Sequence, residues 1–384
     1  MNRMYPPIKS ACAIALLTAV SPSFAEQTAA PADGERNHAK IVEFDAPGAG
    51  TTAGLGTFAM ANNNEGTIVG YYVDANVVPH GFVRSAGGKI KPFDAPGAGL
   101  GAGLNQGTIA IAVNDLGAIA GELQDDNYVF HGFVRSRSGH FTTLDVSGAG
   151  TSLDQGTAVF DINLDGVLAG IYIDEANLVH GFVSSSSGQV QSFDPPGSGY
   201  TFVCDETCLT AEGAVTGFFS DSSSVFHGFL REPDGTITTF DGPQAAQIPF
   251  FGTFPASINA EGEITGYTVD ANNVAHGFLR RGDGTFAEFD VPSASLASGE
   301  GTVAYSINLS RAVTGAFYDA NSATHGFTRS ARGVITTFDA PNAGTGPSEG
   351  TRPSTNNSEG DVTGWYIDAS DVSHGFVRKT ARDD

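Results

Sequence analysis

The chain has 384 residues, and its 42 acidic and 19 basic residues give a formal net charge of −23. So acidic a surface repels phosphate backbones and anionic lipids, which excludes nucleic acid and membrane surfaces as expected partners. The 50 glycines and 27 phenylalanines, beside 16% charged residues, favour many turns and many short strands. No apolar run is long enough for a membrane-spanning helix, so we expect no span in the mature protein.

The first 25 residues have the pattern of an export signal. Arg3 and Lys9 precede a short apolar stretch at 10–20, and small residues before Ala25 suit a cleavage site. A buried N-terminal helix is the alternative. Residues 26–39 are polar and predict a mobile leader. The sequence therefore predicts an exported protein, either periplasmic or extracellular, with a signal peptide at 1–25 and a leader at 26–39.

Three anchors recur through the rest of the chain. The first is a histidine followed by Gly-Phe, which returns every 47 to 51 residues. The second is an aspartate six residues before each histidine. The third is an aspartate after Phe or Leu. It lies 14 residues after each of the first six histidines, and a further copy, Asp45, precedes the first histidine. The third-anchor residues are Asp45, Asp94, Asp145, Asp194, Asp241, Asp290 and Asp339. Such self-similarity indicates a repeat architecture.

Each repeat contains four short runs typical of strands, separated by turn-forming residues. In the first repeat the runs are TFAMAN, TIVGYYV, HGFVRS and KIKPFD, and no ten-residue stretch has a helical period. Four antiparallel strands in 40 to 50 residues, repeated seven times, indicate an all-β protein, a seven-bladed β-propeller of four-stranded blades. A β-solenoid is the second possibility.

The ends of the repeated region favour a closed ring. KIVEFD at 40–45 reads as a fourth strand without the preceding three, whereas HGFVRK at 374–379 reads as a third strand without a fourth. The N-terminal strand would therefore complete the C-terminal blade and remove the open sheet edges. We expect one propeller domain over 40–384, and a monomer.

With its His-Gly-Phe steps in the frame G-x-[IVL]-x-G-x-x-x-D-x5-H-G-F, the chain resembles the HAF-repeat family of bacterial exported proteins over residues 40–380. The family step is His-Ala-Phe, so glycine replaces alanine here. The resemblance implies export and tandem repetition, and it implies no reaction.

The repeated histidine is interpreted as structural. The aspartate six residues earlier would accept a hydrogen bond from the imidazole and pin the turn between the second and third strands. One Asp and one His per blade are too few ligands for a tight zinc site, so no metal is predicted. The expected pairs are Asp74–His80, Asp125–His131, Asp174–His180, Asp221–His227, Asp270–His276, Asp319–His325 and Asp368–His374.

Two further motifs are interpreted as turns. The glycine-rich FDAPGAG has no following helix or basic residue to form a phosphate cradle, so no cofactor is predicted. An asparagine after the first strand of most repeats supplies a turn-forming side chain. These asparagines are Asn63, Asn114, Asn163, Asn259, Asn308 and Asn357.

Function is expected where the repeats differ, just before each first strand, because loops that vary over a rigid scaffold usually carry binding. Amides and carboxylates would face aromatic rings there, at a mouth of the central channel, and suit a neutral polar ligand such as a sugar. The alternative is that these side chains only pack the loops. The candidate ligand-binding residues are Gln106, Gln155, Tyr200, Phe202, Phe250, Phe251, Glu300, Glu349 and Arg352.

Two functions follow from these residues. The first is an exported binding module for a glycan or an extracellular protein. The second is a carbohydrate hydrolase or lyase in which Glu300 and Glu349, from adjacent blades, serve as the acid and base pair.

Cys204 and Cys208 are the two cysteines that remain after the signal peptide, and we expect them to form a disulfide. Residues four apart in a straight strand lie about 13 Å from each other, so the bond requires CDETC to buckle. Two buried thiols in a regular strand are the alternative.

Overall fold

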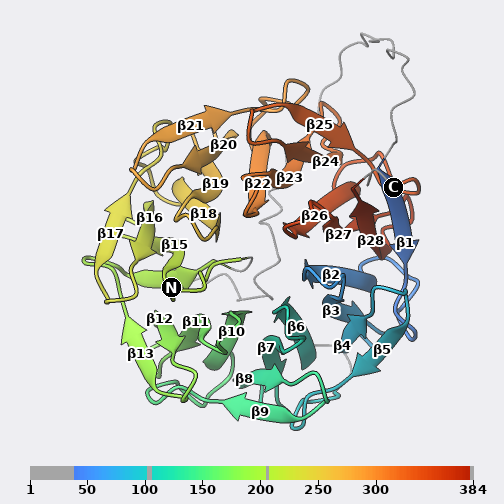
Figure 1. Ribbon diagram of the computed structural model, residues 1–384, viewed down its shortest axis with the longest axis vertical. Coiled ribbons are helices and arrows are strands. Elements are labelled where there is room, and N and C mark those ends of the chain that lie inside the picture. Colours follow the sequence, from blue (N-terminus) through green and yellow to red (C-terminus); the bar gives the residue numbers. More distant parts are fainter. Residues whose placement is uncertain (1–38, 102–105, 205–206, 381–384) are drawn as a thin grey trace, which may run out of the picture.

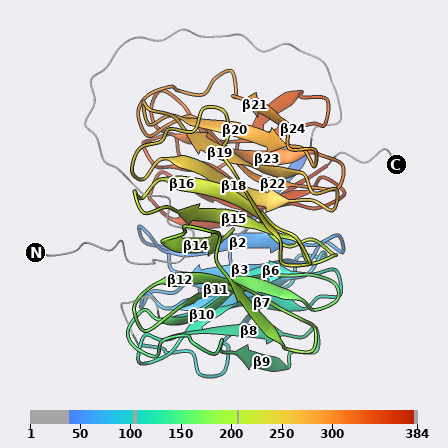
Figure 2. The same cartoon turned by 90° about the vertical axis from the view of Figure 1, so that its left-hand side faces the viewer.

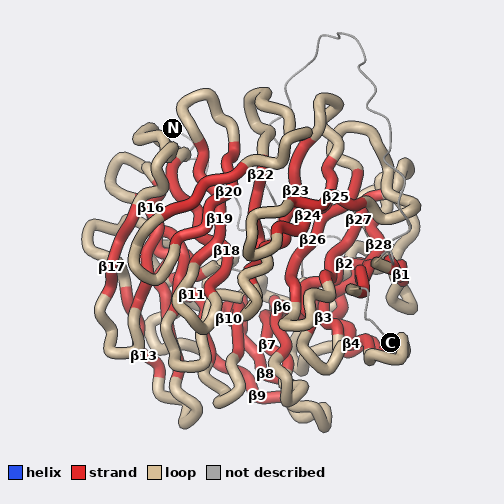
Figure 3. Tube along the Cα trace, turned by 45° about the horizontal axis from the view of Figure 1, so that its top comes forward, coloured by secondary structure: helices blue, strands red, loops and turns tan. Residues whose placement is uncertain are grey.

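The computed structural model describes residues 39–101, 106–204 and 207–380. All of the regular structure in those residues is β-strand, and Figure 3 shows strands and loops without a helix. The all-β prediction is therefore confirmed. The expected signal peptide at 1–25, and the leader except its last residue, lie outside the described residues.

The strands in chain order are β1 (Lys40–Phe44), β2 (Gly56–Asn62), β3 (Ile68–Val73), β4 (Pro79–Arg84), β5 (Ile90–Phe93), β6 (Gly107–Val113), β7 (Ile119–Gln124), β8 (Phe130–Arg135), β9 (Phe141–Leu144), β10 (Gly156–Ile162), β11 (Leu168–Ile173), β12 (Val179–Ser184), β13 (Val190–Phe193), β14 (Tyr200–Val203), β15 (Val215–Ser220), β16 (Phe226–Arg231), β17 (Ile237–Phe240), β18 (Gly252–Ile258), β19 (Ile264–Val269), β20 (Ala275–Arg280), β21 (Phe286–Phe289), β22 (Thr302–Ile307), β23 (Val313–Tyr318), β24 (Thr324–Arg329), β25 (Ile335–Phe338), β26 (Gly350–Asn356), β27 (Val362–Ile367) and β28 (Ser373–Lys379).

Antiparallel pairing groups the strands in fours, and we call each group a unit. Units 1 to 6 are β2–β5, β6–β9, β10–β13, β14–β17, β18–β21 and β22–β25. Unit 7 consists of β26, β27, β28 and β1. Figure 1 shows the units around a common centre, with first strands such as β2, β6 and β10 inside and fourth strands such as β5 and β9 outside.

Strand β1 is the outer strand of unit 7, although it comes first in the chain. It pairs with β28 from Lys40 opposite Lys379 to Phe44 opposite Gly375. The sequence predicts a fourth strand that completes the last repeat over 40–45, and β1 covers the first five of those six residues. The pairing places the two ends of the described chain in one sheet.

The strands run between two faces of the molecule, where the loops gather (Figure 2). One face carries the loops between units, such as 45–55, and the turns between second and third strands, such as 74–78. We call it the loop face. The opposite face carries the turns after the first strands, which begin with the repeated asparagines, and we call it the asparagine face. Each first strand therefore starts at the loop face and ends at the asparagine face.

The phenylalanine of the His-Gly-Phe step is fully buried in the core of every unit. Phe82, Phe133, Phe182, Phe229, Phe278, Phe327 and Phe376 are each no more than 1% exposed. The preceding glycine is required by close packing. A Cβ atom on Gly277 would lie 2.8 Å from the ring of Phe289, so alanine does not fit here without movement. Five other glycines of this step have a fourth-strand phenylalanine ring as close or closer, and Gly132 has Val159 at 2.7 Å.

Arginine side chains link neighbouring units at the outside. The guanidinium of Arg84 in unit 1 lies 4.7 Å from the ring centre of Phe44 in unit 7. Five similar arrangements join Arg135 to Phe93, Arg231 to Phe193, Arg280 to Phe240, Arg329 to Phe289 and Arg378 to Phe338. Such cation–π contacts contribute roughly 0.5–2 kcal/mol each. They tie the fourth strand of one unit to the third strand of the next.

Candidate functional site

A cavity of about 310 Å³ opens where the first strands of all seven units end, at the asparagine face. Its lining includes aliphatic side chains contributed by five units, which are Ile111, Ile162, Leu209, Ile258 and Ile307. Polar side chains complete it, among them Asn64, Asp115, Thr207, Asn356 and Ser358. The cavity therefore combines an apolar lining with amide and hydroxyl groups.

The repeated asparagines form a chain of hydrogen bonds around this cavity. Each side-chain amide donates to a backbone carbonyl at the equivalent position of the next unit. The bonds run from Asn63 to Asn114 (2.9 Å), Asn114 to Asn163 (2.9 Å), Asn163 to Thr210 (3.1 Å), Asn259 to Asn308 (3.5 Å), Asn308 to Asn357 (2.8 Å) and Asn357 to Asn63 (3.1 Å). The amides are fixed before any ligand arrives.

The asparagines also make the turns that the sequence predicted. The Oδ1 atom of Asn63 accepts from the backbone N–H of Thr67 at 2.9 Å, and Asn114 accepts from Ala118 in the same way. The contacts between units were not predicted. Their signal in the sequence is the constant place of asparagine directly after the first strand, because equivalent positions of adjacent units become neighbours around the centre.

The residues expected to bind a ligand lie at the other end of the first strands, at the loop face. A seven-residue strand is about 20 Å long, so the two ends are far apart. Among the residues that the structure describes, none of the nine candidates lines the cavity at the asparagine face. The expected binding region and the cavity are therefore different places.

Amide and carboxylate candidates hold the loops in place. Gln106 donates to the carbonyl of Asp126 at 3.2 Å, and Gln155 donates to Oδ1 of Asn177 at 2.9 Å. Both glutamines are buried. Glu349 accepts from the backbone N–H of Gly346 at 2.7 Å. These contacts agree with the alternative, that the side chains pack the loops.

Glu300 and the arginine candidate lie near the seam between units 6 and 7. The Oε1 atom of Glu300 accepts from the hydroxyl of Ser322. Arg352 is buried, donates to the carbonyl of Ser348 at 3.0 Å and lies 5.1 Å from the ring centre of Trp365. Arg352 therefore packs inside the wall between units.

The aromatic candidates are in different environments. Phe202 stacks on Phe218 with ring centres 5.1 Å apart, inside the wall between units. Tyr200 and Phe251 are partly buried, and the carbonyl of Phe251 accepts from the N–H of Phe226 at 2.9 Å. Only Phe250 among the four is widely exposed, at 70%. They do not form one aromatic wall of a mouth.

The histidine pairing expected from the sequence needs a correction. In every unit, Nδ1 lies 2.7 to 3.0 Å from the aspartate that follows the fourth strand, as in His80 to Asp94 and His276 to Asp290. The aspartate six residues earlier is farther away, with Nε2 to Oδ2 distances of 3.5 to 3.8 Å. Each histidine therefore lies between two carboxylates, and the later one is the main partner.

The earlier aspartate accepts backbone hydrogen bonds in the turn between the second and third strands. Asp221 accepts from the backbone N–H of Ser223 at 2.7 Å and of Val225 at 2.9 Å. The Val225 bond first, and then the Ser223 bond and the nearby His227, hold the pKa of Asp221 below its usual value. For His325, the hydrogen bond to Asp339 raises the pKa of the imidazole against the opposing effect of burial. Asp339, with Asp319, therefore favours the protonated imidazole of His325.

In the part of the chain that the structure describes, no cluster of three or more His, Cys, Asp or Glu side chains could hold a metal ion. No helix there is long and apolar enough to cross a membrane.

The two cysteines follow β14, which has four residues where the other first strands have six or seven. Cys204 donates its N–H to the carbonyl of Thr216 at 3.3 Å, and the N–H of Thr216 donates to the carbonyl of Cys208 at 3.1 Å. Both cysteines are buried and meet the same residue of the neighbouring strand. Two cysteines four positions apart therefore bond to one residue of β15. The disulfide itself stays a prediction.

Asp161 of unit 3 bonds to the backbone that follows Cys208. Asp161 accepts from the backbone N–H of Leu209 at 2.9 Å and of Ile162 at 2.7 Å. Burial raises the pKa of Asp161 to about 7, opposed by backbone hydrogen bonds from Ile162, Leu209 and Cys208. Sequence reasoning missed this residue, because nothing in the repeat indicates which unit supports the irregular strand.

No protein-family model and no curated protein matches the sequence. Among solved structures, the chain resembles the β-propeller domain of the Trilobed protease from Pyrococcus furiosus, with a TM-score of 0.52 and 9% identity over 85% of this chain and 100% of that one. The fold is a β-propeller. It also resembles the BP39L lectin from Burkholderia pseudomallei, with a TM-score of 0.53 and 11% identity over 90% of this chain and 97% of that one. At these identities the likeness concerns the fold alone.

Proposed function

We propose that this protein is an exported β-propeller that binds a neutral polar ligand, such as a sugar residue of a glycan, in the cavity at the asparagine face. The cavity of about 310 Å³ carries this proposal. Ligand sites are typically 300–1,000 Å³, with an apolar lining and a few fixed polar groups. The exposed lining side chains of Leu164 and Leu309 would contact the C–H face of a sugar ring, and the rim amides and hydroxyls would bond to its hydroxyl groups.

The charges around the cavity favour a neutral ligand. Asp115 lies at the rim, where its carboxylate accepts from Asn64 at 2.8 Å, and Asp161 bonds to backbone N–H groups. No lysine or arginine belongs to the cavity lining among the described residues. An anionic ligand would therefore lack a counter-charge. The propeller fold of the BP39L lectin is compatible with glycan binding.

The proposed architecture is a closed ring of seven blades, with β1 completing the last blade. The β1–β28 pairing supports it, as do two contacts between units 7 and 1. Asn357 donates to the carbonyl of Asn63, and the hydroxyl of Ser354 donates to the carbonyl of Ala59 at 3.0 Å. Export and membership of the HAF-repeat family are part of the proposal and rest on the sequence patterns at 1–25 and 40–380.

The alternative of a hydrolase or lyase that uses Glu300 and Glu349 is less favoured. Each carboxylate bonds within its surroundings, to Ser322 and to the N–H of Gly346. A catalytic pair must instead face a bound substrate.

A binding screen tests the proposal. The protein without residues 1–25 is incubated with a panel of neutral, acidic and basic oligosaccharides, and binding is followed by saturation-transfer NMR and release of reducing ends by a colorimetric assay. We expect binding of a neutral member without turnover. Binding that Ser358→Trp removes and Phe250→Ser retains would assign it to the cavity, because the two positions lie on opposite faces. Turnover lost in Glu300→Gln and Glu349→Gln would contradict the proposal.

A further inference from the structure

The seam between units 2 and 3 contains a buried carboxyl group at a position that is otherwise uncharged. Glu122 of β7 is 7% exposed and lies opposite Ile109 of β6. It follows the glycine of its second strand. The residues at the same position in the other units are Tyr71, Ile171, Phe218, Tyr267, Ala316 and Trp365. Packing between units therefore does not require a carboxyl group.

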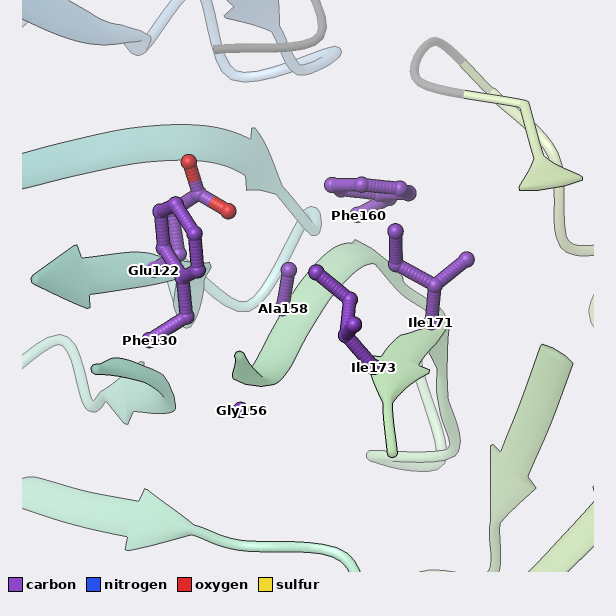
Figure 4. Close-up of a pocket in the computed structure, with 7 residues that line it drawn as sticks. All are labelled: Glu122, Phe130, Gly156, Ala158, Phe160, Ile171 and Ile173. Atoms are coloured by element: carbon purple, nitrogen blue, oxygen red, sulfur yellow. The ribbon is translucent and has the colours of Figure 1, made fainter. Parts of the chain in front are cut away.

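A small residue on the facing strand leaves space for this carboxyl group. Ala158 of β10 stands where units 1, 4 and 5 have Phe58, Phe202 and Phe254. A cavity of about 10 Å³ remains, about enough for one water molecule. Figure 4 shows Glu122 and Phe130 on one side of it and Phe160, Ile171 and Ile173 on the other. The surroundings of the carboxyl group are thus aliphatic and aromatic.

No described side chain offers a positive charge to the carboxyl group of Glu122. Within the described residues, its carboxyl group has no hydrogen bond or ion pair, and the other six residues around the cavity are apolar or glycine. Titratable and charged side chains on the packed strands have other contacts, and Arg135 of β8 lies over the ring of Phe93 at 4.8 Å. Asp161 of β10 accepts backbone N–H groups, and His131 of β8 bonds to Asp145 at 2.7 Å. On β11, no titratable side chain lines the cavity, so a negative charge on Glu122 would be uncompensated.

We propose that Glu122 is a proton-binding site in the seam between units 2 and 3, where the protonated carboxyl group stabilises the packing of β7 against β10 and the carboxylate loosens it.

The direction of the pH dependence follows from burial. Burial raises the pKa of Glu122 from 4.5 to about 7. A raised pKa means that the folded protein holds this proton more tightly than the unfolded chain. The contribution of Glu122 to stability is therefore complete below pH 4.5, and it is lost as the pH rises to about 7. Above that pH, no further loss from this group is expected.

Equilibrium unfolding in urea between pH 4.5 and 8 tests the proposal, with the protein without residues 1–25 and its Glu122→Gln variant. Glutamine has the shape of the protonated carboxyl group and cannot ionise. Relative to the variant, we expect the folded-to-unfolded ratio of the unmodified protein to fall by a factor on the order of a hundred across this range. Glu232→Gln, which changes an exposed glutamate, is the matched control and should follow the unmodified protein. Parallel pH profiles of the unmodified protein and Glu122→Gln would overturn the proposal.

A second measurement does not depend on how the variant folds. In protein labelled with ¹³C at the glutamate carboxyl carbon, the Glu122 signal is titrated directly, and Glu122→Gln or Glu122→Leu serves only to assign it. A midpoint above pH 6, with faster hydrogen exchange in 119–124 and 156–162 above the midpoint after correction for intrinsic rates, supports the proposal. A midpoint in the usual glutamate range, or exchange that does not follow the titration, overturns it.

Discussion

Nδ1 of His374, close to the last described residue, lies 2.9 Å from Oδ1 of Asp45, close to the first. In the other six units, both members of this pair come from consecutive strands 14 residues apart, as in His276 and Asp290. In unit 7 they are separated by 329 residues. The aspartate that follows the N-terminal strand therefore makes in unit 7 the hydrogen bond that the aspartate after the fourth strand makes in the other units. Unit 7 thus combines strands from the two ends of the described chain.

Removing residues 40–46 should destabilise the protein strongly, whereas removing 26–38 should not. The first deletion exposes the edge of β28 and takes away Phe44, which packs against Arg84 and Phe82. Loss of a packed phenylalanine alone costs about 3 kcal/mol or more. Thermal unfolding of both truncations and of the protein without residues 1–25 measures the effect. Equal melting temperatures for all three would show that β1 does not stabilise unit 7.

The corrected histidine pairing gives different effects for the two aspartates of one unit. His276→Ala should lower the free energy of unfolding by roughly 1–3 kcal/mol, because Asp290 loses its donor and the side chain is well buried. Asp290→Asn should cause part of the same loss, because it weakens the hydrogen bond to Nδ1 of His276. Asp270→Asn should act through the turn, where Asp270 accepts from Asn272 and Val274.

A double-mutant cycle in urea separates these contributions. We expect coupling between positions 276 and 290 that exceeds the coupling between 276 and 270. The reverse order would restore the pairing that the sequence suggested. Ligand binding should survive in every variant that folds, because the histidines are at the loop face.

The asparagine hydrogen bonds have one gap, between Thr210 of unit 4 and Asn259 of unit 5. Asn308→Ala should lower the free energy of unfolding by about 1–3 kcal/mol, since the turn N–H of Ala312 and the carbonyl of Asn357 both lose a partner. Thr210→Asn should instead raise it by about 0.5–1.5 kcal/mol, by reaching Asn259 while keeping the turn bond to Ala214. Urea unfolding compares the two variants, and a destabilised Thr210→Asn would contradict the expectation that an asparagine can close the gap.

Cys204 and Cys208 should form a disulfide in the exported protein. The backbones of both cysteines bond to Thr216 of β15, whereas residues four apart in a straight strand lie too far from each other for a disulfide. Mass spectrometry after alkylation without reduction measures the outcome. We expect no alkylated cysteine and a mass two hydrogens below that of the reduced chain. Two alkylated cysteines would leave both as buried thiols.

The strands were predictable because anchors repeat with constant spacing. The histidine partner was also within reach. Gly81 pairs with Phe93, so His80 faces Asp94 in the same antiparallel hairpin, but the shorter spacing to Asp74 was preferred. The cavity at the asparagine face was not predictable from one repeat, because all seven units contribute to its lining. The cavity beside Glu122 results from Ala158 of another unit, which a single repeat does not reveal.

A crystal structure of the protein bound to the neutral oligosaccharide selected by the binding screen tests the central claim most directly. We expect the sugar in the cavity at the asparagine face, with its ring against exposed lining residues such as Leu309 and its hydroxyl groups bonded to rim residues such as Ser358. A sugar bound instead at the loop face, beside Phe250 or Glu300, would contradict the account.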